Sequence, residues 1–187
     1  MENHSAYLIP IVAGAVLAIV VLVLRTYNRL VRLRLRLRNA WADIDVELKR
    51  RHDLVPQLVE TVRGYMGHER QIFDTVAQAR VAVGTGSGEI SARAAAEMQF
   101  AGAIRKLLLT VERYPELKAV ENFRLLHEQL VSTENRVAFA RQHYNEAVRQ
   151  YNTALATFPA NAIGPLLGFS AAAMFAGASS ERAVPQV

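Results

Sequence analysis

The chain has 187 residues, 51% of them hydrophobic, and no cysteine, which excludes disulfides, thiolate metal sites and thiol catalysis. Its formal net charge is +5, but six of its 22 Lys and Arg residues lie within residues 25–38. Without those six, 16 basic residues face 17 acidic ones, so the rest of the chain lacks the clustered positive charge that nucleic-acid binding requires.

A long apolar run lies near the N-terminus. Residues 1–6 form a short flank, and residues 7–24 carry no charged side chain. As a helix, this run would extend roughly 27 Å, close to the thickness of a bilayer's hydrocarbon core, so we expect a transmembrane helix. A cleaved signal peptide is disfavoured, because no Lys or Arg precedes the run and it ends in VLVLR. A buried core helix is disfavoured by the arginines that follow.

Residues 25–38 form a basic juxtamembrane segment in which the same helix continues. Short flanks rich in Lys and Arg stay on the cytoplasmic side. We therefore predict a single-pass protein of the inner (cytoplasmic) membrane, with the N-terminus outside and the helical domain in the cytoplasm. The basic side chains would contact anionic headgroups, at about 1 kcal/mol each. They are Arg25, Arg29, Arg32, Arg34, Arg36 and Arg38.

The alternation of Arg and Leu from Val31 to Arg38 has the period of a strand. We nevertheless predict a helix, because both residues are good helix formers and apolar spacings of three and four continue beyond. Leu35 lies off this stripe. Two places for the helix to kink or end stay open: Asp53–Pro56, and the Gly64–Gly67 segment. The predicted stripe is Leu30, Leu33, Leu37, Ala40, Ile44, Leu48, Val55, Leu58, Val62 and Tyr65.

Two shorter helices are predicted next, over 68–83 and 90–113. The glycine-rich stretch 84–88 between them is predicted to be a plain loop, because neither a preceding strand nor a following Lys-Ser/Thr supports phosphate binding. Pro115 is well placed to begin the next helix. The predicted core faces are Ile72, Val76, Ala79 and Val83 in the first helix, and Met98, Ala101, Ile104, Leu108 and Val111 in the second.

The last long helix is predicted up to Phe158, with Pro159 ending it. Its seam alternates spacings of three and four, as in a coiled coil. If Phe158 lies level with Thr26 in an antiparallel arrangement, the numbers of paired residues sum to about 184. The Gly64–Gly67 break and the turn at Pro115 then fall at one end. The seam is Phe123, Leu126, Leu130, Thr133, Val137, Ala140, Tyr144, Ala147, Tyr151, Ala154 and Phe158.

The predicted fold is all-α: a transmembrane helix followed by an antiparallel up-down four-helix bundle over residues 26–158. Residues 159–179 are uncharged and contain two prolines and three glycines, so we expect an interfacial or shallowly re-entrant membrane segment. A flexible, partly ordered tail is the alternative. Residues 180–187 are predicted to be disordered.

No arrangement of residues indicates catalysis. The five histidines are scattered, and neither His-Glu pair continues into a zinc-protease motif, so we expect no metal or cofactor site and no enzymatic activity. The acids Asp43, Asp45 and Glu47 could suggest an acid–base pair. Their spacing favours ion pairs four residues apart, from Asp45 to Lys49 and from Glu47 to Arg51.

The pairing rule also predicts contacts between the two long helices. Glu134 should lie near Arg50 or Arg51, and Arg141 near Asp43 or Glu47. We expect these side chains to form a charged layer that fixes the register of the helices.

Five stretches resemble the LemA family and follow one another in order over residues 26–169. The resemblance implies a bacterial, single-pass protein with an N-terminal anchor and a cytoplasmic, bromodomain-like four-helix bundle. It also implies a relative in the magnetosome membrane, and no established enzymatic activity. The stretches are YNRLV from Tyr27, NAWADIDVELKRRHDLVPQLVETVRGYMGHE from Asn39, YPELKAVENF from Tyr114, STENRVAFARQHYNEAVRQYN from Ser132 and FPANAIGPLLGF from Phe158.

Two functions follow as hypotheses. The first is an anchored, non-enzymatic bundle that self-assembles into homo-oligomers and scaffolds or shapes the membrane. The second is an accessory or regulatory subunit that docks a membrane protease or transporter. Anionic lipid headgroups are expected partners in both cases, and nucleic acid in neither.

Overall fold

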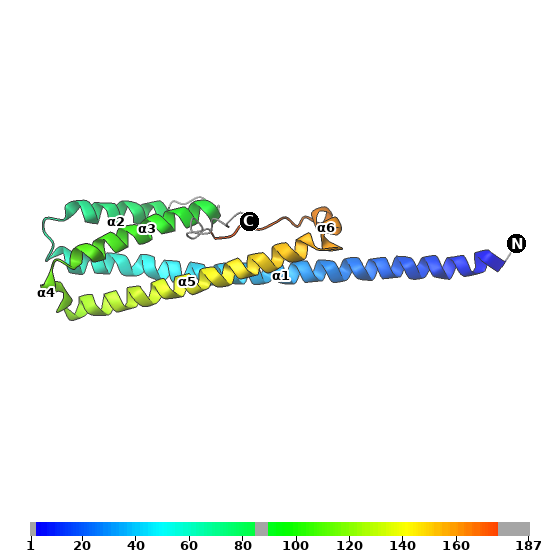
Figure 1. Cartoon of the computed structure of the whole chain (residues 1–187), viewed down its shortest axis with the longest axis horizontal. Coiled ribbons are helices and arrows are strands. Elements are labelled where there is room, and N and C mark those ends of the chain that lie inside the picture. Colours follow the sequence, from blue (N-terminus) through cyan, green and yellow to red (C-terminus); the bar gives the residue numbers. More distant parts are fainter. Residues whose placement is uncertain (1–2, 85–89, 176–187) are drawn as a thin grey trace, which may run out of the picture. The chain divides into compact units, whose positions relative to one another are not determined.

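A computed structural model describes residues 3–84 and 90–175, and all regular elements of this part of the chain are helical (Figure 1). The predicted all-α class is confirmed for these residues. The predicted loop at 85–88, residues 176–179 and the predicted tail at 180–187 lie outside the described residues. The helices are α1 (Asn3–Arg63), α2 (Arg70–Gly84), α3 (Ile90–Val111), α4 (Pro115–Lys118), α5 (Glu121–Ala156), α6 (Ala160–Ile163) and the 3-10 helix η1 (Pro165–Leu167).

Helix α1 contains both the apolar run and the basic segment. Within the described residues it is the one helix long and apolar enough to cross a membrane by length and composition. Its large apolar side chains from Ile11 to Leu24 are mostly exposed. The Arg–Leu alternation is helical, as predicted, and Leu35 lies exposed off the buried stripe.

The end of α1 settles the two alternatives left open by the sequence. The helix runs through Pro56 to Arg63, and the amides of Tyr65 and Met66 bond the carbonyl of Val62 at 3.0 and 3.1 Å. The break at Gly64–Gly67 is therefore confirmed, and the helix does not end at Asp53–Pro56. Proline removes one helical hydrogen bond, and burial of the neighbouring Val55 and Leu58 offsets that loss. After the break, Met66 is buried instead of the predicted Tyr65.

The chain divides into two compact units, and both α1 and α5 contribute to each. Of the described residues, the first unit contains 3–39 and 146–172, and the second contains 40–84, 90–145 and 173–175. In the second unit, α2 packs along α3. The core of the second unit draws on α1 to α5, with Val55, Leu58, Val62, Met66, Phe73, Val76, Phe100, Ala103, Ile104, Leu107, Val111, Leu117, Phe123 and Leu130.

The buried face of α3 is rotated from its predicted position. Met98 is exposed, and Ala94, Glu97 and Phe100 are buried instead. A further difference concerns the connection into α5: Pro115 begins the separate short helix α4, and α5 starts only at Glu121. Apolar spacing predicts a face without Glu97, because a charged residue does not extend an apolar pattern.

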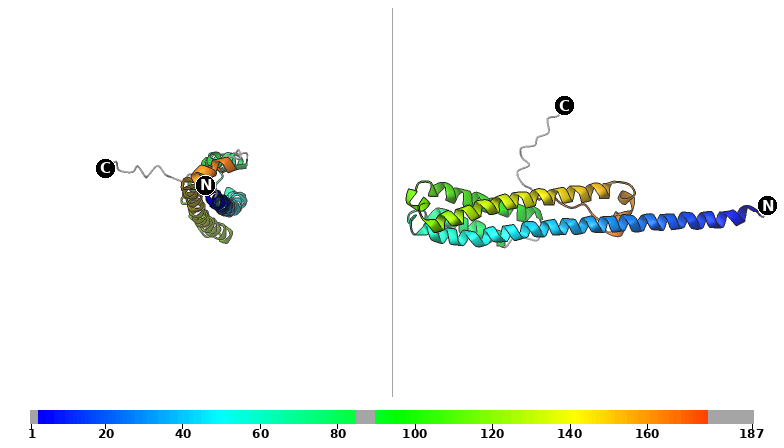
Figure 2. Two further views of the ribbon diagram at one scale, coloured as in Figure 1. Left: turned by 90° about the vertical axis from the view of Figure 1, so that its right-hand side faces the viewer. Right: turned by 90° about the horizontal axis from the view of Figure 1, so that it is seen from below.

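The first unit has its own small core. Leu30 of α1 shares it with Tyr151 and Ala154 of α5, as the pairing rule predicts, and with Ala160 and Phe169 beyond α5. Helix α5 ends at Ala156, so Phe158 lies beyond it with 81% of its surface exposed and not in the predicted seam. Figure 2 shows the chain reversing at α6, directly after the end of α5.

Two glycines make this reversal possible. A Cβ atom on Gly164 would lie 2.5 Å from Cδ1 of Leu155 and 2.7 Å from the carbonyl oxygen of Ala160. Gly168 has a φ of +76°, which favours glycine, and it ends η1. The sequence GPLLG therefore encodes a tight turn against α5.

The burial of Met66 in place of the predicted Tyr65 can be tested by two neighbouring substitutions. Met66→Ala should lower the free energy of unfolding by about 2–5 kcal/mol, because it leaves a cavity in the core. Tyr65→Ala should change it by no more than about 0.5 kcal/mol, because that side chain is half exposed. Urea denaturation of both variants measures the difference. Equal losses would contradict the observed position of Met66.

Candidate functional site

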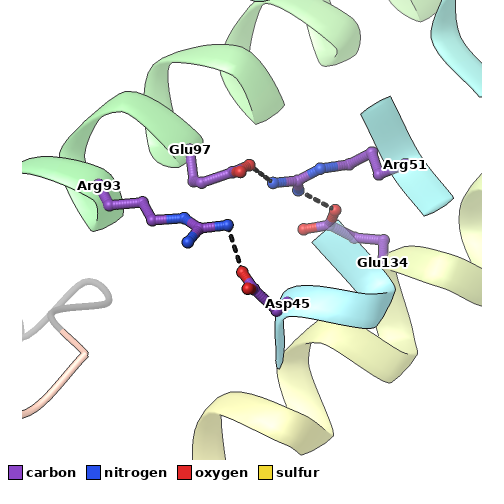
Figure 3. A network of polar contacts seen from close by, with 5 residues as sticks. All are labelled: Asp45, Arg51, Arg93, Glu97 and Glu134. Carbon is purple, nitrogen blue, oxygen red and sulfur yellow. Dashed lines mark hydrogen bonds and ion pairs between the residues drawn. The ribbon is translucent and has the colours of Figure 1, made fainter. Parts of the chain in front are cut away.

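A network of charged side chains connects three helices of the second unit (Figure 3). Arg51 of α1 donates one hydrogen bond to Glu97 of α3. It donates another, from Nη1, to Oε2 of Glu134 on α5, at 2.9 Å. One guanidinium therefore bridges α1, α3 and α5.

The centre of this network is buried. The side chains of Arg51 and Glu97 are only 3% and 4% exposed, whereas that of Glu134 is 51% exposed. The Cζ atom of Arg51 also lies 5.8 Å from the centre of the Phe100 ring. A charge held away from water is tolerated only when it is paired and hydrogen-bonded, so each of these groups depends on the others.

A second, more exposed pair lies beside the network. Arg93 of α3 bonds Asp45 of α1, and its Cζ atom lies 5.5 Å from the centre of the Trp41 ring. Both charged side chains keep a third or more of their surface in solvent, so this pair is worth less than the buried one. It adds a further link between α1 and α3.

The structure places in contact only some of the charged residues that were predicted from the sequence to pair. Glu134 contacts Arg51, whereas Arg50 is exposed and takes no part in the network. Arg51 and Asp45 bond α3 or α5 and not the neighbours predicted four residues away, because α3 supplies Glu97 and Arg93.

The expected partner of Arg141 also differs. Glu47 lies 3.7 Å from Arg136, and Asp43 lies 3.9 Å from His143. Arg141 instead places its Cζ atom 5.1 Å from the centre of the Phe175 ring. Its partner belongs to a C-terminal segment that the pairing rule did not consider.

Glu97 and Arg93 were missed from the sequence. Glu97 lies three residues after the buried Ala94 and three before the buried Phe100. A charged residue on an apolar face is the signal that would have indicated a buried ion pair.

Residues 169–175 form an extended segment, which we name the strap. In the first unit its Phe169 is buried against Tyr27, with ring centres 5.8 Å apart, and beneath Arg34. In the second unit its Phe175 packs against Trp41, with ring centres 5.9 Å apart. The strap thus carries a buried aromatic side chain in each unit.

The backbone of the strap is held by paired amide contacts. In the first unit, Asn152 both donates to the carbonyl of Ala172 and accepts from its amide, each at 2.9 Å. In the second unit, Asn145 does the same for Phe175, at 3.2 and 2.8 Å. These contacts satisfy main-chain groups of the strap, so they do not depend on which side chains the strap carries.

Two tyrosines complete the attachment. Tyr151 donates to the carbonyl of Ser170, and Tyr144 to that of Ala173, each at 2.9 Å. Burial raises the pKa of both phenols, so both stay protonated donors. The repeat YN-x5-YN in α5 matches the strap, because seven helical residues rise about 10.5 Å and three extended residues span roughly 10 Å.

The strap changes the interpretation of the apolar C-terminal segment. Its two aromatic side chains are buried in protein and several of its main-chain groups are hydrogen-bonded to α5, a packing role that the sequence did not suggest. Phe158 and Leu166 point away from this packing and are exposed. Lipid contact by these two side chains stays a prediction.

The six arginines of the basic juxtamembrane segment 25–38, which we name the collar, have different surroundings. Arg34 lies over Phe169, whereas Arg29, Arg32 and Arg36 line an open cavity of the first unit. Arg25 and Arg38 are exposed outside that cavity. In residues 10–84 and 90–175, no group of three or more His, Cys, Asp and Glu could hold a metal ion.

Comparison with known proteins identifies the family. The LemA family profile matches residues 40–187, most of the chain. The protein belongs to the LemA family. The matched region contains the ion-pair network and the strap, and it begins after the collar, whose arginines all precede residue 40.

This LemA-family protein is similar in sequence to two magnetosome proteins and to a protein LemA. It is 25% identical to magnetosome protein MamQ 2 of Paramagnetospirillum magneticum, over 92% of this chain and 72% of the relative. It is 23% identical to magnetosome protein MamQ of Magnetospirillum gryphiswaldense, over 83% of this chain and 66% of the relative. It is 22% identical to protein LemA of Metamycoplasma hominis, over 83% of this chain and 71% of the relative.

The buried network predicts an asymmetry between single and paired substitutions. Glu97→Ala should lower the free energy of unfolding by about 3–5 kcal/mol, because it leaves Arg51 buried beside only a half-exposed partner. The double variant Arg51→Met, Glu97→Leu should recover most of that loss. Asp45→Ala should cost no more than about 1 kcal/mol. Denaturation curves that show additive losses for the double variant would contradict the network.

The strap predicts local protection from hydrogen exchange. Replacing both Asn145 and Asn152 by Ala should expose the amides of Ala172 and Phe175, because each loses its acceptor. Asn161→Ala, at an exposed position, is the matched control and should leave both protected. Exchange monitored by mass spectrometry would refute the attachment if protection survived in the double variant.

Proposed function

We propose that this LemA-family protein is anchored in the inner membrane by residues 7–24, with its N-terminus outside and its helical domain in the cytoplasm. Support comes from the exposed apolar side chains of α1 and from the arginines that follow them without interruption of the helix. The relatives named as magnetosome proteins agree with a membrane location.

In this proposal the cytoplasmic domain is an antiparallel up-down four-helix bundle with bromodomain-like topology, made of α1, α2, α3 and α5. Residue numbers of contacting charges rise on α1 as they fall on α5, from Asp43–His143 through Glu47–Arg136 to Arg51–Glu134. This order is the one expected of antiparallel helices. The shared core of the second unit supplies the remaining support.

The domain, in this view, is a non-enzymatic scaffold that self-assembles and organises or shapes the membrane. The observation that carries this function is a pair of large apolar side chains outside the core. Phe139 of α5 and Val46 of α1 are 72% and 66% exposed. Both lie within one helical turn of the Glu47–Arg136 pair, so they belong to one region of the second unit. Exposed apolar groups of this size favour contact with another protein surface.

A second candidate is an accessory subunit of a membrane protease or transporter. It is favoured by a cavity of about 180 Å³ lined mainly by α3 and α5, beside Arg51 and Glu134 of the charged network, which could accept a side chain of a different protein. Ile104, Leu108 and Val131 line this cavity.

Native mass spectrometry in mild detergent tests the scaffold. The full-length protein should form homo-oligomers, and Phe139→Ser should shift them toward monomer because it removes an apolar contact. Leu109→Ser, at a similarly exposed position on α3, should not. Monomers alone in the unmodified protein would contradict self-assembly. Crosslinking in native membranes to one dominant foreign protein would favour the accessory subunit.

The absence of cysteine makes the topology directly measurable. In intact cells, a membrane-impermeant maleimide should label the variant Ser5→Cys, on the outer side of the proposed span. It should label Ser132→Cys, at an exposed position of α5, only after permeabilisation. The reverse pattern would contradict the proposed orientation.

A further inference from the structure

The first unit contains a cavity of about 430 Å³ whose walls are strongly basic. Three of its arginines come from α1, at spacings of three and four residues, which place them on one helical face. A fourth comes from α5. The lining residues are Arg29, Arg32, Leu33, Arg36, Arg149, Gln150, Thr153, Ala154 and Thr157.

The arginines of α1 are available for an added ligand. Arg29, Arg32 and Arg36 are exposed, and none of them pairs with a carboxylate within the described residues. Clustering three unpaired guanidinium groups is unfavourable unless an anion or solvent screens them. The charge of these arginines therefore favours binding of an anion in the cavity.

In the described part of the chain, the positive charge of Arg149 is balanced by a carboxylate, unlike that of the three α1 arginines. Its Nε and Nη2 atoms donate to the two carboxylate oxygens of Glu146, at 2.8 and 2.6 Å. This contact, together with the bond from Gln150, lowers the pKa of Glu146 to about 2, so the pair stays ionised near neutral pH. Glu146 thereby orients Arg149 and Gln150 while the α1 arginines supply the unbalanced positive charge.

The polar groups of α5 fit the same ligand. Gln150, Thr153 and Thr157 lie on the cavity wall opposite the α1 arginines, whereas Leu33 and Ala154 make part of it apolar. Hydroxyl and guanidinium groups are the donors that bind phosphate oxygens, and guanidinium does so in a bidentate manner.

The position of the cavity indicates where its ligand originates. Arg29 lies five residues beyond Leu24, the last residue of the apolar run, which is a rise of about 7.5 Å. Each headgroup layer of a bilayer is roughly 5–8 Å thick. If residues 7–24 span the membrane, Arg29 lies at the outer edge of the headgroup layer, and Arg32 lies about 12 Å beyond Leu24, with helical side chains leaning back toward the N-terminus.

We propose that this cavity binds the phosphodiester headgroup of an anionic phospholipid. The inference rests on the proposed membrane anchor and assigns to it a specific lipid site. Arg29 and Arg32 hold the phosphate oxygens, and the hydroxyl of Thr153 can donate to them. Arg36, about 18 Å beyond Leu24, adds positive charge at the far end of the cavity. Arg25 and Arg38 contribute only to general attraction toward a negative surface.

Two variants of equal charge separate a specific site from general attraction. Arg29→Gln with Arg32→Gln removes two arginines of the cavity, and Arg25→Gln with Arg38→Gln removes two arginines outside it. The mean position along α1 is nearly the same for both pairs. Native mass spectrometry of the full-length protein, titrated with phosphatidylglycerol or phosphatidylcholine, measures binding.

The unmodified protein should bind phosphatidylglycerol in preference to phosphatidylcholine. The cavity variant should bind it at least about tenfold more weakly, because two bidentate donors are lost, and the outer variant should change by no more than about twofold. Equal losses in both variants, or no preference between the two lipids, would overturn the proposed site.

Inorganic phosphate distinguishes the source of the anion. It should compete with phosphatidylglycerol only weakly, because it lacks the acyl chains that hold a lipid beside the span. Competition by phosphate at the concentration of the lipid would overturn a lipid headgroup as the ligand. Failure of the anchor itself would be seen separately, as release of the unmodified protein from membranes by alkaline carbonate.

Discussion

The buried guanidinium of Arg51 is the constraint on which the packing of the second unit depends. Leu, Val and Phe side chains would tolerate many relative positions of α1, α3 and α5, because apolar contact has no direction. A charge that is 3% exposed tolerates very few, because moving it away from Glu97 and Glu134 leaves it without a partner. We therefore expect the ion pairs to contribute specificity of register and the apolar core to contribute most of the stability.

Apolar and polar contacts also have separate roles in holding the strap. Phe169 and Phe175 supply apolar burial in their respective units, whereas the asparagine and tyrosine side chains of α5 satisfy the main chain. Each asparagine uses one N–H of its amide as a donor and its amide oxygen as an acceptor, and an extended residue offers the complementary pair. The YN repeat therefore lets a helix hold an extended segment without a sheet.

Much of the architecture can be predicted from the sequence, because apolar periodicity and helix breaks at Gly and Pro are local signals. The all-α class, the end of α1 near Gly64 and the contact between Arg51 and Glu134 could all be predicted this way. Glu97 could not, because its role depends on how α3 is rotated, which spacing alone does not define. The strap could not either, because an uncharged segment after a proline resembles a membrane-associated one. Its partners lie about 20–30 residues earlier in the chain, at a separation that no helical period describes.

The central claim is that Arg51 and its carboxylates fix the register of α1 against α5. Crosslinking of engineered cysteine pairs by a short bifunctional maleimide, in a chain without native cysteine, tests it most directly. The pair Glu47→Cys, Arg136→Cys, whose native side chains are in contact, should crosslink, and the pair Glu47→Cys, His143→Cys, shifted by two helical turns, should not. Adding Glu97→Ala should weaken the first crosslink and allow the second. An unchanged crosslinking pattern in that background would contradict the account.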